Sequence, residues 1–288
     1  MASSINKPAA KNGVNHRFST PIVLTIAGSD SCGGAGIQAD IKAMSATGSY
    51  ACSVITAITA QNTLGVLAIF PIPLEHIEKQ LDAVFTDLNV VAVKVGMLAD
   101  GDIIKLVAAK IKQYQPKFLV VDPVMVTTSG DLLLPQSAIG ILKSELLPLA
   151  HIITPNLPEA AALIGSTSPS SQKGMVNMVT DLRQLGAKAI LLKGGHLDKE
   201  ENSTDLLILP KEVRAVTAKR IRTRNTHGTG CTLSSAIASY LAQGHDLLKA
   251  VQLSKQYISL AIAHADDLSV GQGAGPVNHF FNRHTDVK

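Results

Sequence analysis

A short segment near the C-terminus combines residue types that could hold an anion. The sequence "HGTGC" at residues 227–231 comes directly before an apolar run that is typical of a helix. The backbone N–H groups of Gly228 to Cys231 would point to one spot, and the helix N-terminus would add about half a positive charge there. Such a spot suits phosphoryl transfer, which depends mainly on positioning and electrostatic stabilisation.

Cys231 occupies this segment and admits several interpretations. A free thiol has a pKa of about 8.5, and a helix N-terminus would lower that pKa toward neutrality, so Cys231 could act as a base. An anion bound at the same spot would instead raise the pKa of the Cys231 thiol. The neighbouring His227 is the only support for a covalent nucleophile, and we interpret it as structural. Cys231 could also be a small residue buried at the start of the helix.

Polar side chains also follow several apolar runs in the second half of the chain. Lys193 in "LLKGGH" lies between an apolar run and two glycines, and could supply a positive charge to a phosphate. Asp122 in "VVDPVM" ends an apolar run, where a carboxylate is costly to bury unless it is paired. Asn156 and Glu159 in "TPNLPEA" are three residues apart, which fits either a helix capping box or a water-mediated Mg²⁺ site.

The first apolar run ends in the glycine-rich segment "GSDSCGGAGIQAD" at residues 28–40. Its "GAGIQA" matches a dinucleotide-binding pattern, but Gln61 stands where the ribose-binding acid should end the second strand. The alternative is a tight turn from strand to helix, or a close approach of a flat ring to the backbone. Asp40 and Gln61 at one rim could bind an amino-pyrimidine, since the carboxylate accepts and the amide both donates and accepts.

The elements that must position these residues alternate along the chain. Their order predicts an α/β protein with a central, mostly parallel sheet and helices on both faces, whose ligands bind at the carboxyl ends of the strands. Periodicity and glycine punctuation predict strands at 21–28, 51–61, 90–96, 117–122, 151–156 and 187–195, a hairpin at 203–222, and helices at 33–48, 74–88, 102–114, 174–186, 232–244 and 247–265.

Composition narrows the class of protein. With 288 residues of which 46% are hydrophobic, the chain can bury a large core. Residues 1–20 carry three basic side chains and no acid, so they account for most of the net charge of +4. The near-neutral remainder disfavours a nucleic-acid partner, and we expect no membrane partner. Three cysteines without a CxxC pair fit a cytoplasmic location. We expect a flexible tail at 1–20 and one domain at 21–288.

Eight segments together resemble a known family. They span about residues 21–281 and resemble the hydroxymethylpyrimidine/phosphomethylpyrimidine kinases of thiamine biosynthesis, which belong to the ribokinase-like superfamily. The resemblance implies a ribokinase-like three-layer sandwich. The segments are "TIAGSDSCGGAGIQADIKAMSATG", "SVITAITAQNTLGV", "KVGMLAD", "DPVM", "ITPNLPEA", "LLKGGHL", "NTHGTGCTLSSAIA" and "GPVNHF".

The resemblance also implies an activity, cofactors and a set of site residues. ATP would phosphorylate 4-amino-5-hydroxymethyl-2-methylpyrimidine and then its monophosphate, with Mg²⁺ as cofactor and a homodimer as the assembly. Gln61 would be the main pyrimidine contact, helped by Asp40. The further implied contacts are Gly28, Ala35, Thr59, Met97 and Val124 around the ring; Lys193, Asn156, Thr226 and Thr229 for ATP; Glu159 and Asp122 for the metal; and Gly228, Gly230, Cys231 and Lys193 for catalysis.

Sugar kinases of the wider superfamily carry Asp as a base where this chain carries Cys231. We hypothesise that a thiol lets one site accept both an alcohol and a phosphate, because a fixed carboxylate would repel the anionic second acceptor. Two rival functions remain open, a pyridoxal-type kinase and a catalytically silent pyrimidine-binding protein. The missing ribose-binding acid disfavours a nicotinamide enzyme.

Overall fold

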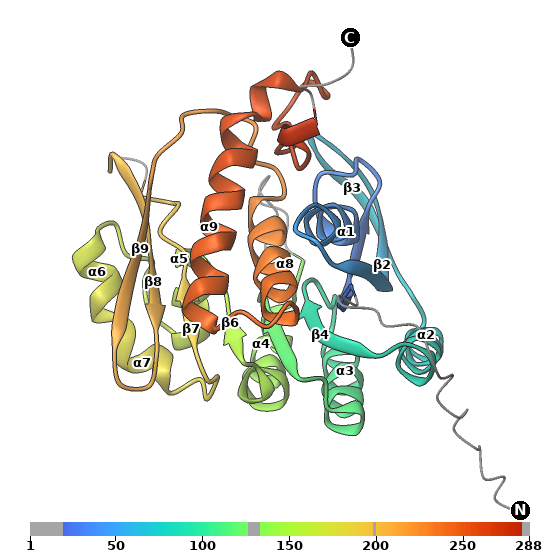
Figure 1. Ribbon diagram of the computed structural model, residues 1–288. Coiled ribbons are helices and arrows are strands. Elements are labelled where there is room, and N and C mark those ends of the chain that lie inside the picture. The colour runs from blue at the N-terminus through green and yellow to red at the C-terminus, as the bar shows by residue number, and fades with distance from the viewer. Residues whose placement is uncertain (1–19, 126–132, 198–199, 284–288) are drawn as a thin grey trace, which may run out of the picture.

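The computed structural model describes residues 20–125, 133–197 and 200–283. A single nine-stranded sheet runs through these residues in the order β3-β2-β1-β4-β5-β6-β7-β8-β9 (Figure 1). Strands β2, β1, β4, β5, β6 and β7 are parallel, whereas β3, β8 and β9 pair antiparallel with their neighbours. The strands are β1 (Ile22–Asp30), β2 (Tyr50–Asn62), β3 (Gly65–Pro71), β4 (Val90–Val95), β5 (Phe118–Val121), β6 (Ile152–Ile153), β7 (Ile190–Leu192), β8 (Asn202–Ile208) and β9 (Val213–Lys219).

Helices cover both faces of the sheet and give the predicted three layers (Figure 1). The α-helices are α1 (Gly36–Ala46), α2 (Leu74–Asp87), α3 (Gly101–Tyr114), α4 (Gln136–Ile141), α5 (Leu157–Ile164), α6 (Gln172–Asn177), α7 (Val179–Arg183), α8 (Thr229–Ala242) and α9 (Leu247–Ala263). Short turns of other helix types are η1 (Leu142–Leu146), η2 (Leu147–Leu149), η3 (Ala265–Asp267) and η4 (Phe281–Arg283).

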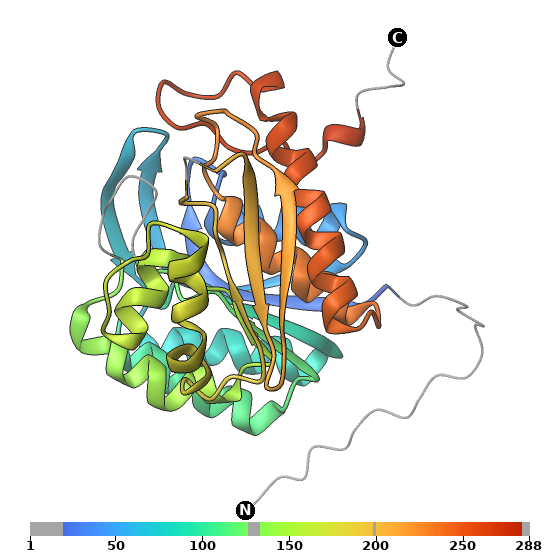
Figure 2. The same ribbon diagram turned by 90° about the vertical axis from the view of Figure 1, so that its left-hand side faces the viewer.

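Two apolar cores lie on opposite faces of the sheet, because successive side chains of a strand point to opposite sides. Val23 of β1 joins the core under α1, α8 and α9, whereas the next residue, Leu24, joins the core under α2, α3, α4 and α5. Both faces of the central parallel strands β1, β4 and β5 are therefore buried, as their continuous apolar runs predict. Figure 2 shows the β8–β9 hairpin lying beside α9 at one end of the sheet.

One predicted helix differs from the structure, and the strand β3 and the helices α4 and α5 are not among the predicted elements. The helix expected at 174–186 is interrupted at Met178, whose N–H donates to the carbonyl of Met175 at 3.2 Å, and it forms α6 and α7 instead. The strand β3 (Gly65–Pro71) was not expected, because its residues 67–71 are exposed and show no alternation of buried and exposed positions. It pairs with β2 to form a hairpin that extends from the sheet (Figure 2).

The strand order positions the ligand site. The strand β1 (Ile22–Asp30) is hydrogen-bonded to β2 on one side and to β4 on the other, so the connections leave it in opposite directions. A crevice opens at the carboxyl ends of strands at such a reversal. Of the predicted tail, residues 1–19 lie outside the described residues. In the described part of the chain, no helix has the length and apolar character needed to cross a membrane.

Candidate active site

A cavity of about 1010 Å³ opens at the carboxyl ends of the parallel strands. It brings together every site residue that the sequence analysis named, with the exception of Asp40. The lining includes Gly28, Ala35, Thr59, Gln61, Met97, Asp122, Val124, Asn156, Glu159, Lys193, Thr226, Gly228, Thr229, Gly230 and Cys231. These residues follow different strands, so their convergence is a consequence of the parallel sheet.

The loop at residues 226–231 carries the predicted anion site. Gly228 precedes α8 with a φ of 80°, and a Cβ on it would lie 1.7 Å from the carbonyl oxygen of Gly34. Only glycine fits this left-handed position against the neighbouring loop. The N–H of Thr229 donates to the carbonyl of Thr226 at 3.3 Å. Because a glycine offers no capping side chain, the next N–H groups of α8, those of Gly230 and Cys231, remain available to a ligand in the cavity.

Lys193 and Asp122 form a buried ion pair below this loop. The Nζ of Lys193 donates to Oδ1 of Asp122 at 2.8 Å, and Asp122 also accepts from the hydroxyl of Thr154 at 2.8 Å. A Cβ on Gly230 would lie 3.3 Å from that Nζ, so the ammonium lies close to the start of α8. Burial by itself would raise the pKa of Asp122, but the ammonium groups of Lys193 and Lys94 outweigh it and hold that pKa below its usual range.

Glu159 completes this cluster and serves two purposes. Its Oε2 accepts from the N–H of Asn156 at 2.7 Å, while Asn156 Oδ1 accepts from the N–H of Glu159 at 2.8 Å, so the predicted capping box is present. The same Oε2 lies 3.9 Å from Nζ of Lys193 and the residue lines the cavity. Burial raises the pKa of Glu159 to about 7, and the carboxylate of Asp122 adds to this effect although Lys193 opposes it.

The donor set fits a magnesium ion that arrives with phosphates. Within the described ranges, no group of three or more His, Cys, Asp or Glu side chains is arranged to hold a metal. Mg²⁺ commonly keeps several waters and takes one or two carboxylates together with phosphate oxygens. Glu159 and Asp122, which flank Lys193 in the cavity, supply that number of carboxylates.

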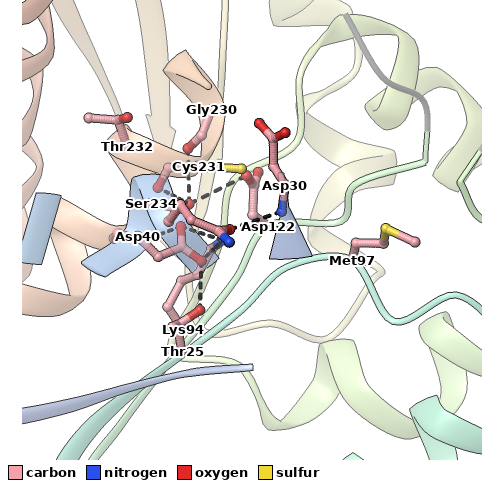
Figure 3. Close-up of polar contacts among 12 residues, drawn as sticks. Thr25, Asp30, Asp40, Lys94, Met97, Asp122, Gly230, Cys231, Thr232 and Ser234 are labelled. Carbon is pink, nitrogen blue, oxygen red and sulfur yellow. Dashed lines mark hydrogen bonds and ion pairs between the residues drawn. The ribbon is translucent and has the colours of Figure 1, made fainter. Parts of the chain in front are cut away.

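Asp40 does not lie where the sequence analysis expected it. It is fully buried and absent from the cavity lining, so the predicted direct contact with a ring does not fit the structure. Its carboxylate accepts from Nζ of Lys94 at 2.8 Å, from Thr25 Oγ1 at 2.6 Å and from Ser235 Oγ at 2.7 Å. The side chain lies on the face of α1 that packs on β1 and α8, below the cavity (Figure 3).

Gln61 lies at the other end of the cavity with two residues that the sequence analysis did not assign to the ring site. Its Nε2 is 3.5 Å from Nε2 of His227, and that nitrogen is 2.8 Å from Oδ2 of buried Asp30. Asp30 also accepts from the N–H groups of Gly34 and Ala35, which fixes the glycine-rich loop. Burial would raise the pKa of Asp30, but these hydrogen bonds hold it below its usual range. The position of Asp30, at the end of an apolar strand, was the available signal.

Cys231 lines the cavity as a protonated thiol. Burial raises its pKa to about 11, the carboxylates of Asp40 and Asp122 add to the effect, and Lys94 opposes it. The lowering toward neutrality that the helix N-terminus predicted is therefore wrong, since the buried environment and the two carboxylates outweigh the helix. At neutral pH Cys231 can donate a hydrogen bond but cannot accept a proton as a base.

The cavity extends from the loop at residues 226–231, called the transfer loop below, toward β8, β9 and α9. Ile258 and Ile262 of α9 contribute apolar walls there, and the basic segment 219–224 begins at the last residue of β9. Lys255 Nζ donates to Oδ2 of Asp205 at 2.7 Å between them. This end has the apolar walls and polar rim of a small-molecule site. The sequence analysis did not assign ligand contacts to these elements, because the individual residues carry no motif.

The three-layer fold, the glycine loop at a helix N-terminus and the buried lysine with two carboxylates define an ATP-dependent kinase of ribokinase-like architecture. Residues 30–278 match the family model described as phosphomethylpyrimidine kinase. The chain belongs to this family.

Individual relatives agree with this assignment. A hydroxymethylpyrimidine/phosphomethylpyrimidine kinase of Rhizobium meliloti (strain 1021) is 51% identical over 261 residues, covering 91% of this chain and 97% of that protein. The crystal structure of phosphomethylpyrimidine kinase from Clostridium difficile 630 is 48% identical with a TM-score of 0.74, covering 84% of this chain and 100% of that one. An ADP complex of Bacillus subtilis pyridoxal kinase is 36% identical with a TM-score of 0.85, covering 92% and 100%.

Proposed function

We propose that the protein uses ATP to phosphorylate 4-amino-5-hydroxymethyl-2-methylpyrimidine, and then phosphorylates the monophosphate to the diphosphate for thiamine diphosphate biosynthesis. The observation that carries the proposal is one continuous cavity with Gln61 at one end, the β9–α9 walls at the other, and the Gly228–Cys231 loop between them. An acceptor and a nucleotide bound at the two ends would meet at that loop. The family membership supports the same reaction.

The acceptor end suits a flat amino-pyrimidine. The Gln61 amide can pair with the ring's amino group and adjacent nitrogen, because it offers a donor and an acceptor side by side. Thr59 Oγ1 lies 3.1 Å from Gln61 Oε1 and so helps to orient the amide. The wall around the ring would consist of Gly28, Ala35, Met97 and Val124, all of which line the cavity.

The transfer loop would stabilise the phosphoryl group that moves. In the first step the hydroxymethyl oxygen attacks the γ-phosphorus of ATP, its bond to the β-phosphate oxygen breaks, and ADP leaves with that electron pair. The N–H groups of Gly228, Gly230 and Cys231 and the ammonium of Lys193 would face the negative charge. Because the Cys231 thiol is protonated, we propose that the hydroxyl proton passes to water or to a phosphate oxygen.

The nucleotide would be held from three sides. Thr226, Thr229 and Asn156 line the cavity around Lys193 and offer polar groups to the phosphates. Glu159 and Asp122 would hold Mg²⁺ through water and phosphate oxygens. Bound there, Mg²⁺ would neutralise phosphate charge and orient the oxygens. Glu159 must be ionised for this role, so its raised pKa favours activity above about pH 7.

The test supplies the two acceptors separately with ATP and Mg²⁺, and follows ADP release together with the mass of each product. We expect the pyrimidine alcohol to gain one phosphoryl group and its monophosphate to gain a second. Pyridoxal is the matched competitor, since the likeness to the pyridoxal kinase structure supports an acceptor ring with a hydroxymethyl group. A higher kcat/KM for pyridoxal, or ATP binding without any product, would contradict the proposal.

We also propose a homodimer and a cytoplasmic location. The β2–β3 hairpin exposes Leu67, Ile69 and Phe70 on an edge strand, and such a patch is typical of a protein interface. The use of ATP and the three free cysteines suit the cytoplasm. Light scattering on the purified protein should give a dimer mass that Leu67→Lys reduces to the monomer mass; a wild-type monomer would contradict the first proposal.

A further inference from the structure

The side chain of Lys94 is a buried cation that the reaction described above does not use. It is the next-to-last residue of β4 (Val90–Val95) and is fully buried, a position that lysine almost never takes without a partner. Its Nζ lies 2.8 Å from each carboxylate oxygen of Asp40. The pair lies below the loop that carries Gly230 and Cys231 (Figure 3).

Hydrogen bonds from two other elements hold this pair in place. Asp40 Oδ1 also accepts from Ser235 of α8 at 2.7 Å, and Oδ2 accepts from Thr25 of β1 at 2.6 Å. Each oxygen of Asp40 therefore accepts two hydrogen bonds in total. An ammonium has three N–H groups, so Lys94 retains one beyond the two that it directs to Asp40.

Gly96 lets the lysine reach the cavity. It lies two residues beyond Lys94 on the same face of the strand, and a Cβ on it would lie 2.8 Å from Nζ of Lys94. The side chain thus extends along β4 toward the carboxyl end of the sheet. There Lys94 lines the cavity together with Gly28 and Met97 at the acceptor end, and with Cys231 at the transfer loop.

The charges around the acceptor indicate what the ammonium of Lys94 could do in the reaction. Lys193 is already paired with Asp122 and lies near Glu159. The monophosphate that enters the second step carries about −1.5 to −2 charges at neutral pH, whereas the alcohol of the first step carries none. The carboxylate of Asp122 and the phosphates of ATP repel the second acceptor only. The ammonium of Lys94 lies in this region, because Lys94 lines the same cavity as Met97 and Cys231.

We propose that Lys94 determines specificity for the anionic acceptor, with Asp40 as the residue that positions it. This inference rests on the proposed two-step function. In the second step a deprotonated phosphate oxygen attacks the γ-phosphorus, the bond to the β-phosphate oxygen breaks, and ADP leaves with the electron pair. The attacking oxygen carries no proton, so this step needs no base. It does need a cation near the acceptor phosphate, to offset the repulsion from Asp122 and from the phosphates of ATP.

The test compares kcat/KM for the alcohol and for the monophosphate in Lys94→Met. Removal of the cation should lower kcat/KM for the monophosphate at least roughly tenfold more than for the alcohol. Two further variants guard against misfolding. Lys94→Met with Asp40→Asn leaves no buried unpaired charge and should show the same selective loss. Gly96→Ala keeps both charges but displaces Nζ, and should show a weaker selective loss.

Lys110→Met provides the matched control, since Lys110 is also a buried lysine, paired with Asp82 at 2.7 Å, but it is absent from the cavity lining. Its ratio of the two kcat/KM values should equal that of wild type. Equal losses for both acceptors in all Lys94 and Gly96 variants would overturn the inference while leaving the proposed function intact. A wild-type protein that does not phosphorylate the monophosphate would instead contradict the proposed function, and this inference with it.

Discussion

Two lysine–aspartate pairs lie under the cavity with similar distances and different surroundings. Lys193–Asp122 and Lys94–Asp40 both join Nζ to a carboxylate oxygen at 2.8 Å. In the first pair the side chains are 14% and 2% exposed, whereas both are 0% exposed in the second. A cavity-facing ammonium can exchange its partner for a phosphate. The Lys94–Asp40 pair has no exposed surface and is called the sealed pair below. Lys94 borders the cavity, so the pair would act on a ligand mainly through the charge of Lys94, and it also holds neighbouring elements together.

The place of each lysine along its strand explains the difference. Lys193 directly follows β7 (Ile190–Leu192) and Asp122 directly follows β5 (Phe118–Val121), so both lie at the carboxyl edge of the sheet. Lys94 lies within β4, where it pairs with Thr25 of β1 and Val120 of β5. Residues at strand ends meet ligands, while residues within central strands are covered by helices on both faces.

The largest effect should come from breaking the cavity-facing pair. Lys193→Met should lower kcat for both acceptors by about 10²–10³-fold or more, because it removes the charge that faces the transferred phosphoryl group. The measurement is steady-state ADP release with each acceptor. Lys188→Met, which changes an exposed lysine just before β7, is the control and should keep wild-type kcat. Similar losses in the two variants would show that the Lys193–Asp122 pair has no special role.

The second prediction concerns Cys231, whose pKa depends in part on Lys94 and Asp40 of the sealed pair. Cys231→Asp places a carboxyl group beside the acceptor, and it should lower kcat/KM for the monophosphate roughly tenfold more than for the alcohol. Cys231→Ser stays neutral and should affect both acceptors by a similar factor. If Cys231→Asp also changes both steps by one factor, the hypothesis that a thiol serves two acceptors fails.

The third prediction concerns Glu159, whose carboxyl group lies beside the cavity-facing pair of Lys193 and Asp122. The pKa of Glu159 is raised from 4.5 to about 7 in the folded chain, so the folded state binds more protons between these values. The free energy of unfolding should therefore fall as pH rises from about 4.5 to 7, by up to about 3 kcal/mol. Urea unfolding of wild type and Glu159→Gln at pH 5 and pH 8 measures this. A stability difference between the two proteins that does not change with pH would contradict it.

The smallest effect should come from removing one hydrogen bond to the sealed pair. Thr25→Val removes one hydrogen bond to Asp40 without changing the shape of the side chain, and should lower the free energy of unfolding by about 1 kcal/mol. Both kcat values should remain close to wild type, because Lys94 and Ser235 still hold the carboxylate. Thr86→Val at an exposed helical position is the stability control. A large loss of activity in Thr25→Val would mean that the sealed pair must be rigid for catalysis.

Much of the candidate site could be predicted because strand ends are readable in the sequence. An apolar run followed by a polar residue and glycines located Lys193, and a similar pattern located Asp122. Both lie in the cavity. Asp40 was misplaced because its position within a helix does not say which face of that helix packs against the sheet. The sequence analysis did not assign Asp30 and His227 to the ring site, because their contact joins residues that are 197 positions apart in the chain.

The sequence by itself determined the alternating elements, the three-layer architecture and the set of residues at the carboxyl edge, since these follow from local periodicity and from the geometry of parallel strands. The tertiary structure alone decided the protonation of Cys231 and the burial of Lys94 with Asp40. Those properties depend on how much water the packed helices exclude and on charges contributed by distant strands. Neither quantity is encoded in the residues that flank Cys231 or Lys94.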